Sequence, residues 1–422
     1  MKAPGWYGAF LVGNMAMGAA SALLPLYAYF LGGTAADVGA LAAVGSLTNV
    51  LASLFWGKLA DRTRRRRPFV VLSFAGFALA YGLLPLVGRP GPLYPLNVWV
   101  AFTWMASAQM AVLFLLSSLP RELWERELGR FNAYCGVGWT LGLALGAVWV
   151  TVLVPLTGEA WGLRSLGVVV AALALVATGL AGRSIKDTGG KVEAPAFREF
   201  AATMGGYLYE ILRYGPVQLY EVLRPSQVVR FLQGKTVFGP DLILVYYAGL
   251  LTFVGFSMVF APFPVFVRQK LQWPNEFVFV LYVAHHGVSV VAFSWARKAV
   301  ARWGHRPVAS LALVSRAGMF SALVFMGSGA KWALPALFGL FGATWAMFHL
   351  AMTAVVSRLS PAGQQGQGLG LYNAVAGLGS VLGSLGGGFL AEWIGFPAAF
   401  LSGAALLVLT LPILLVEGRP VP

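Results

Sequence analysis

Long apolar segments alternate with short polar ones along almost the whole chain. Each apolar segment has about 20 residues, the length at which an α-helix crosses a hydrocarbon layer of roughly 30 Å. Inside lipid, a helix satisfies all of its own backbone hydrogen bonds. We therefore expect an all-α membrane protein with about twelve transmembrane helices, at residues 7–30, 38–57, 69–88, 97–118, 131–155, 164–182, 242–267, 277–296, 307–328, 332–356, 369–391 and 397–415.

The longest interruption of this pattern separates six predicted spans from six. It predicts an N-terminal six-helix bundle at 1–182, a linker at 183–241 and a C-terminal six-helix bundle at 242–422. The linker continues as "FREFAATMGGYLYEILRYGPVQLYEVLRPSQVVRFLQGK", in which apolar and charged residues mix with helical spacing in places. Two interpretations stay open, namely amphipathic helices on the inner membrane surface and a folded cytoplasmic linker without lipid affinity.

The two halves carry similar residues in the same order. "RFNAYCGVGWTLGLALGAV" begins at residue 130, and "LYNAVAGLGSVLGSLGGGF", which begins at residue 371, aligns with it so that Asn132 matches Asn373. "RRRRP", ending at Pro68, has a shorter counterpart in "GHRP", ending at Pro307. A repeat of half the chain predicts two pseudo-symmetric bundles with the transport site between them. Small residues at every fourth position allow close helix packing, a role that we assign to Gly138, Gly142, Gly146, Gly379, Gly383 and Gly387.

Composition and charge agree with a membrane protein. Hydrophobic residues make up 58% of the chain and charged residues only 11%, against roughly 25% charged in soluble domains. About 24 of the Lys and Arg residues fall in loops on the side of the N-terminus and about 5 on the other side, which is the positive-inside pattern. It predicts that both termini lie in the cytoplasm. The net charge of +15 is then explained by the basic loops that fix the orientation of the helices in the membrane. No nucleic-acid partner is expected.

The most charged stretch follows the second predicted span and reads "GKLADRTRRRRP". It resembles the G-x-L-a-D-R-x-G-R-R motif of the major facilitator superfamily, with an arginine in place of the second glycine. The matching residues are Gly57, Leu59, Asp61, Arg62, Arg66 and Arg67. The resemblance covers nearly the whole chain and implies two six-helix bundles working by alternating access. It also implies that Asp61 helps to close the cytoplasmic side, with Arg121 and the helix N-terminus near residues 366–368 as partners. The arginines also fit a simple topological anchor, and the two roles are compatible.

Within the superfamily, the chain resembles the drug and solute efflux branch, with incomplete antiporter motifs. The proline of that branch's glycine motif in span 5 is absent between Gly136 and Gly146, and the arginine of span 4 is absent from residues 97–118. By the same resemblance, spans 1, 4, 7 and 10 line the solute cavity, flanked by spans 5 and 11. The candidate cavity residues are Asn14, Trp104, Gln109, Asn132, Tyr246, Tyr247, His285, Trp345, His349 and Asn373. For each aromatic residue, helix packing is the alternative role.

Ionisable residues inside the membrane are costly and are candidates for function. All 15 carboxylates fall in loops or at span ends, which argues against a carboxylate proton carrier and against a strongly cationic solute. His285, His286 and His349 are candidate proton carriers, because imidazole titrates near neutral pH. The alternative is a histidine hydrogen-bonded to a neighbouring helix. Arg316 is the basic residue deep in a span, and we expect it to extend toward the membrane surface, with anion binding as the alternative.

These patterns predict a secondary transporter in the cell's inner membrane that exports a small neutral or amphipathic organic solute. The alternatives are a uniporter or proton symporter of a sugar- or nucleoside-like metabolite, and a lipid or lysolipid translocator. An intramembrane enzyme is disfavoured because no catalytic constellation is present, and an ATP-driven pump because no nucleotide-binding loop is present. We expect a monomer whose partners are the solute, the lipid bilayer and protons, with no cofactor and no metal.

Overall fold

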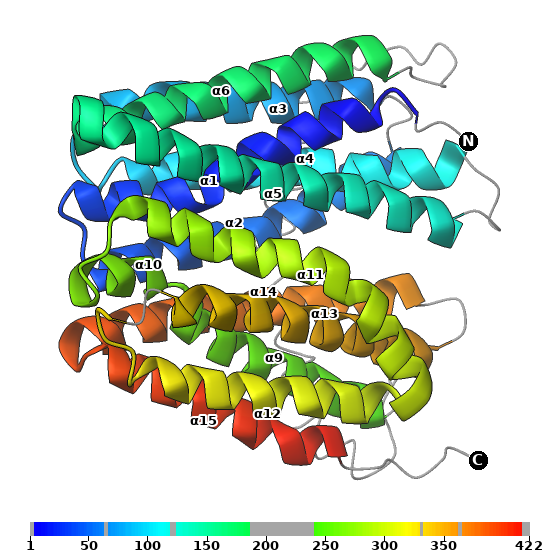
Figure 1. The fold of residues 1–422 in the computed structure, drawn as a ribbon. Coiled ribbons are helices and arrows are strands. Elements are labelled where there is room, and N and C mark those ends of the chain that lie inside the picture. The colour runs from blue at the N-terminus through cyan, green and yellow to red at the C-terminus, as the bar shows by residue number, and fades with distance from the viewer. Residues whose placement is uncertain are drawn as a thin grey trace. The chain divides into compact units, whose positions relative to one another are not determined.

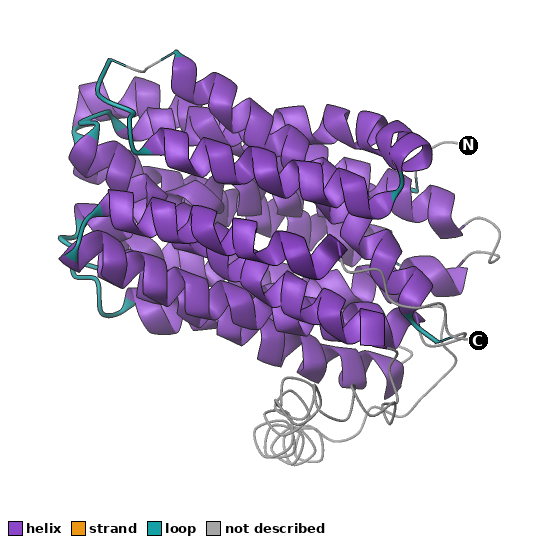
Figure 2. Ribbon diagram, turned by 90° about the horizontal axis from the view of Figure 1, so that it is seen from below, coloured by secondary structure: helices purple, strands orange, loops and turns teal. Residues whose placement is uncertain are grey.

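The computed structural model describes residues 4–62, 66–118, 124–185, 240–329, 332–361 and 365–415. In these ranges the chain is helical throughout, apart from short loops (Figure 2). The helices of the first half are α1 (Tyr7–Phe30), α2 (Ala35–Arg62), α3 (Arg67–Leu83), α4 (Leu93–Ser118), α5 (Trp124–Thr157) and α6 (Glu159–Ser184). Those of the second half are α9 (Pro240–Phe260), α11 (Asn275–Trp303), α12 (His305–Leu323), α13 (Ala333–Leu359), α14 (Gln365–Trp393) and α15 (Phe396–Leu415), as Figure 1 labels them.

Ten of these twelve long helices are long and apolar enough to cross a membrane, judged on the described residues. The two others are α4 and α12, and α12 carries the polar residues His305, Arg306 and Arg316. The all-helical, multi-span architecture predicted from the sequence is therefore confirmed. The number of twelve spans and the cytoplasmic position of both termini stay predictions.

The chain divides into two compact units. Unit 1 comprises residues 1–23 and 48–220, and unit 2 comprises residues 24–47 and 221–422. Unit 2 includes the start of α2, where the Ala35 N–H donates to the Glu392 carboxylate (3.0 Å) and Gly39 lies against the backbone of Gly388. The predicted linker falls mostly outside the described residues, so the division at 182 and 241 and the amphipathic surface helices stay predictions.

Glycines bring helix backbones into direct contact in both units. In unit 1, α5 packs on α1, and a Cβ at Gly138 or Gly142 would overlap the carbonyl oxygen of Leu11 or Met15. The next glycine of the series, Gly146, is also buried. In unit 2, α14 packs on α9 in the same way, and the pairs of glycine and carbonyl are Gly379 with Leu250, Gly383 with Val254, and Gly387 with Met258. The aligned glycines of the repeat therefore make equivalent contacts.

A tyrosine marks the same helix pair in both units, near the beginning of each helix. In unit 1 the Tyr7 hydroxyl of α1 donates to the backbone oxygen of Glu127 on α5 (3.4 Å) and to its carboxylate (3.3 Å). In unit 2 the Tyr246 hydroxyl of α9 donates to the backbone oxygen of Gly368 on α14 (3.2 Å). The offset between Glu127 and Gly368 in the sequence is the same as the offset between the aligned glycines Gly142 and Gly383. The internal repeat is thus present in hydrogen bonding as well as in packing.

The seventh predicted span, 242–267, differs from the prediction because it is interrupted. The helix α9 ends at Phe260, and the chain continues as a short helix α10 (Phe263–Val265) and a π-helical turn (Phe266–Lys270). Pro262 and Pro264 lie at this break; proline lacks the backbone N–H and its ring clashes with the preceding turn. In α1 a single proline, Pro25, lies inside a continuous helix. The ninth span also ends earlier than predicted, because α12 stops at Leu323.

We predict that Gly383→Ala lowers the stability of the folded protein by about 1–3 kcal/mol, because the added Cβ meets a carbonyl oxygen that belongs to a rigid helix. The melting temperature of the detergent-purified protein measures this effect. The matched control is Gly370→Ala on the same helix, where nothing lies within 4 Å and alanine is the better helix former. Equal melting temperatures of the two variants would contradict the prediction.

Candidate functional site

The predicted cavity residues of unit 1 are engaged within the bundle. Asn14 of α1 is buried, and its side-chain amide donates to the Phe10 carbonyl one turn earlier (2.8 Å). The Trp104 ring of α4 packs against Phe77 of α3, with 5.5 Å between ring centroids. Gln109, further along α4, is half-buried. Asn14 therefore has its donor satisfied locally, whereas Gln109 keeps part of its surface accessible.

In unit 2, α13 presents an aromatic face. Trp345 and His349 lie one helical turn apart and stack with 5.3 Å between centroids and 22° between planes. Trp345 is half-buried and His349 is exposed. Phe253 of α9 meets the Trp345 ring edge-on, with 6.1 Å between ring centroids. Tyr247, one of the two predicted cavity residues on α9, is half-buried. The stack supplies a flat, weakly polar surface that suits an apolar or aromatic ligand.

The histidine pair of α11 lies beside α13. Gly342 of α13 packs directly on the His285 backbone, and the His285 ring meets Phe260 of α9 at 6.0 Å. The His286 ring lies 5.0 Å from the His285 ring, and both side chains are half-buried. Among the described residues, the buried His285 Nδ1 has no hydrogen-bond partner. His285 is therefore the member of the pair that points toward α9 and carries an unused polar atom.

The asparagines related by the repeat, Asn132 of α5 and Asn373 of α14, are both exposed. Eleven residues make about three turns of an α-helix, so Asn373 lies on the same face of α14 as Ser384. The backbone oxygen of Ser384 contacts Gly39 of α2. Asn373 thus lies on a face that is packed at one end and exposed at the other, whereas Gly379 and Gly383 lie on the face toward α9.

Arg316 corrects the expectation that its side chain reaches the membrane surface. It is only 1% exposed, and its Nε donates to the Thr344 hydroxyl of α13 (3.1 Å) while Nη2 donates to the Phe341 carbonyl. The guanidinium carbon lies 4.4 Å from the centre of the Phe256 ring and within 6 Å of three further rings, those of Phe260, Phe341 and Trp345. Hydrogen bonds and cation–π contacts therefore hold the charge inside unit 2.

A signal for this site was present in the sequence. Phe256 and Phe260 are four residues apart on α9, as Phe341 and Trp345 are on α13, and residues four apart share one helix face. The aromatic faces of α9 and α13, together with the Thr344 hydroxyl of α13, form a cage for the cation of Arg316 on α12.

The superfamily motif is only partly described. Helix α2 continues to Arg62, but the surroundings of Gly57 and the side chains of Asp61 and Arg62 are not described, and Arg121 lies outside the described residues. Arg66 is half-buried just before α3, and Arg67 is the exposed first residue of that helix. The closing role of Asp61 and its partners therefore stays a prediction.

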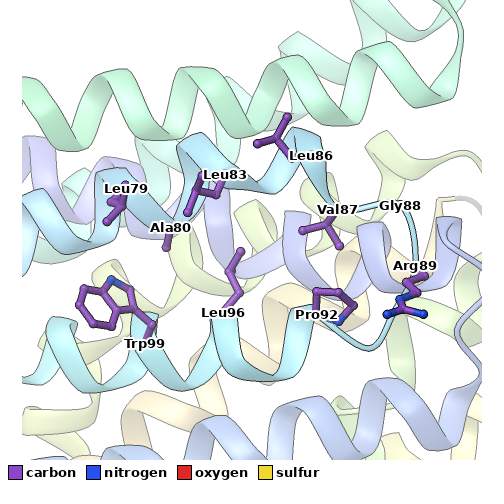
Figure 3. A pocket seen from close by; sticks show the side chains of 10 residues that line it. All are labelled: Leu79, Ala80, Leu83, Leu86, Val87, Gly88, Arg89, Pro92, Leu96 and Trp99. Atoms are coloured by element: carbon purple, nitrogen blue, oxygen red, sulfur yellow. The ribbon is translucent and has the colours of Figure 1, made fainter.

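A groove of about 810 Å³ lies between α3 and α4 (Figure 3). Its walls are apolar, and its charged member is Arg89 at the loop end. The Trp99 indole N–H in the wall already donates to the Gly76 carbonyl (2.9 Å). None of the predicted cavity residues lines this groove, nor the two smaller cavities on the α11/α13 and α12/α15 surfaces. The described residues also contain no cluster of metal-ligating side chains.

Known proteins to which this chain is similar are membrane transporters. A family model described as "MFS_1 like family" matches residues 11–402. An uncharacterized MFS-type transporter, YfiS of Bacillus subtilis (strain 168), is 36% identical over 72 residues, which are 17% of each chain. The structure of a variant of the nucleoside transporter NupG has a TM-score of 0.75 at 11% identity, over 97% of this chain and 98% of that one. A D-xylose-proton symporter has a TM-score of 0.67 at 12% identity, over 97% and 95%. The structural likenesses show the fold alone.

We predict that the exposed end of the Asn373 face is in contact with water. In a variant without Cys135, the single cysteine of the chain, Asn373→Cys should react with a membrane-impermeant maleimide in proteoliposomes permeabilised to the reagent. The control is Leu382→Cys, an exposed position on the opposite face of the same helix, which should react at least about tenfold more slowly because thiolate forms poorly in lipid. Equal labelling rates would contradict the prediction.

Proposed function

Because the chain belongs to the MFS_1 like family of the major facilitator superfamily, we propose that it is a secondary transporter that moves a small organic solute by alternating access. Proteins of this family and the similar structures are transporters, so the chain is a multi-span membrane transporter and not an enzyme. The observation that carries the mechanism is the duplicated helix contact. In each unit, glycines fix α5 on α1 or α14 on α9, and such repeated bundles are the moving bodies of alternating access.

For the solute we propose a neutral or amphipathic organic compound, with export as the direction. The Trp345–His349 stack and the half-buried Tyr247 and Gln109 offer weakly polar, largely aromatic surfaces, which suit such a compound. The alternatives are import of a nucleoside or sugar, which the names of the similar structures favour, and translocation of a lipid or lysolipid. Location in the inner membrane, a monomeric state and proton coupling belong to the same proposal.

Transport by purified protein in liposomes tests the solute class. Radiolabelled chloramphenicol represents a neutral amphipath, uridine and D-xylose represent the metabolites, and lysophosphatidylcholine represents the lipids. Each is measured against protein-free liposomes, in both directions. Transport of chloramphenicol alone supports the leading proposal, transport of another member supports its alternative, and transport of none contradicts all of these classes.

We predict that Asp61→Asn slows turnover by about tenfold, which corresponds to roughly 1.4 kcal/mol, while the affinity for solute added from outside changes little. The physical reason is that the variant loses a charged acceptor for helix N–H groups and arginines when the cytoplasmic side closes. Initial transport rates and equilibrium binding measure the two quantities. Arg183→Gln, at an exposed position in the last turn of α6 and outside the motif, is the control with near-normal turnover. Wild-type turnover of Asp61→Asn would refute the closing role.

We predict that transport responds to a pH gradient and that His285→Gln abolishes this response while solute binding is retained; His349→Gln, which also alters the Trp345–His349 stack, should abolish the response as well. Imidazole is the side chain in the described spans that exchanges a proton most readily near neutral pH. The rate is measured with and without an imposed gradient. His305→Gln, at the first residue of α12, serves as the control. Wild-type transport that is indifferent to the gradient would rule out proton coupling.

A further inference from the structure

Arg316 is a buried cation that lacks a carboxylate partner among the described residues. Its two hydrogen bonds go to neutral acceptors, the Thr344 hydroxyl and the Phe341 carbonyl, and none of the described residues accepts a hydrogen bond from Nη1. The described carboxylates of unit 2 are Asp37, Asp241, Glu276 and Glu392, and all of them lie at helix ends. Aromatic faces lower the cost of the charge, but they do not neutralise it.

The fold itself does not require this charge. In unit 1 the equivalent helix pair is α3 on α4, and Thr103 and Trp104 of α4 match Thr344 and Trp345 of α13 in the repeat. Phe77 lies as far from Pro68 along α3 as Arg316 lies from Pro307 along α12. The Phe77 ring is fully buried and packs on Trp104, in the way that Arg316 packs on Trp345. One bundle therefore fills this position with an apolar ring, and the other fills it with a cation.

One face of α13 connects the buried charge to an exposed side chain. Phe341, Trp345 and His349 lie one turn apart on one face of α13. Phe341 and Trp345 contact the guanidinium, Trp345 is half-buried, and His349, which stacks on it, is exposed. An aromatic surface thus runs from an exposed side chain to the buried cation.

We propose that Arg316 is the anion-binding group of the solute site, and that the solute is an amphipath whose polar end is a carboxylate or a similar oxyanion. The oxyanion accepts hydrogen bonds from Nη1 and from the nitrogens that now bond Thr344 and Phe341, while the apolar part of the solute lies on the Trp345–His349 stack. A bidentate pair of guanidinium and carboxylate matches in geometry, and the low polarity around Arg316 strengthens it. The inference rests on the proposed transport function and narrows its solute to anions.

Benzoate and its neutral isostere benzamide test the inference through the melting temperature of the full-length protein in detergent. We expect benzoate at about ten times its Kd to raise the melting temperature by about 1.5 °C, with a much smaller rise for benzamide. Arg316→Phe copies unit 1, and it should fold and respond to both compounds alike. Equal melting-temperature shifts of the wild type with benzoate and benzamide would overturn the proposal. So would an Arg316→Phe variant in which benzoate still raises the melting temperature more than benzamide does, by as much as in the wild type.

A second pair of variants tests the charge without removing the arginine. Thr344→Asp places a carboxylate beside Nε, so we expect it to neutralise Arg316 from within and to remove the response to benzoate. Thr344→Asn has nearly the same size without the charge, and it should respond as the wild type does. A benzoate response in Thr344→Asp as large as in Thr344→Asn sinks the proposal, even if Arg316→Phe does not fold.

The binding assay needs no transport, so the two proposals fail separately. Absence of benzoate binding leaves the liposome result for chloramphenicol or uridine unchanged, and it refutes only the role of Arg316. Selective benzoate binding without transport of benzoate, measured in the same liposomes, supports the anion site and refutes the transport cycle.

Discussion

Direct contact between helix backbones at glycine is the interaction on which each unit depends. In lipid, the hydrophobic effect does not drive helices together, so association relies on close packing and polar contacts. Five of the aligned glycines lie where a Cβ would overlap a carbonyl oxygen of the neighbouring helix. A contact made by backbones has little freedom to adjust. The pairs α1 with α5 and α9 with α14 are therefore expected to move as rigid elements, which a rocking mechanism requires.

Close packing of these pairs decides which polar groups remain for function. The Asn14 amide donates a hydrogen bond within its own helix, and the Tyr246 hydroxyl donates a hydrogen bond to α14. The polar groups of unit 2 that we consider available for function are the exposed His349, the Nδ1 atom of His285 and the Arg316 guanidinium. Arg316 and His285 both contact Phe260 of α9, so a change in the position of α9 affects the surroundings of both groups. In the proposed mechanism, the solute-binding group and the proton carrier therefore share one neighbouring helix, α9.

The sequence predicted the helices well because hydrophobic length is imposed by the bilayer. The first span was placed at 7–30, where α1 runs from Tyr7 to Phe30. The break after Phe260 was not predicted from the sequence. A proline does not by itself interrupt a helix, since α1 is continuous through Pro25, and the effect of the two prolines after Phe260 depends on the neighbouring helices. The candidate site was predicted as a set of residue types, not as contacts. Arg316 was misplaced because hydropathy shows the depth of a residue but not the direction of a long side chain.

Differences between the repeats indicate where the two bundles have specialised. Packing glycines and the tyrosine contact are kept in both, so these features serve the common fold. The interruption of α9 and the exchange of an aromatic ring for Arg316 occur in the second bundle only, and Phe260, the last residue of α9, touches the guanidinium. Proline and π-helical turns are the usual sites at which a helix bends, and both occur directly after Phe260. The proposed anion-binding group and the interrupted helix therefore lie together in unit 2, while unit 1 keeps the apolar version of the same packing.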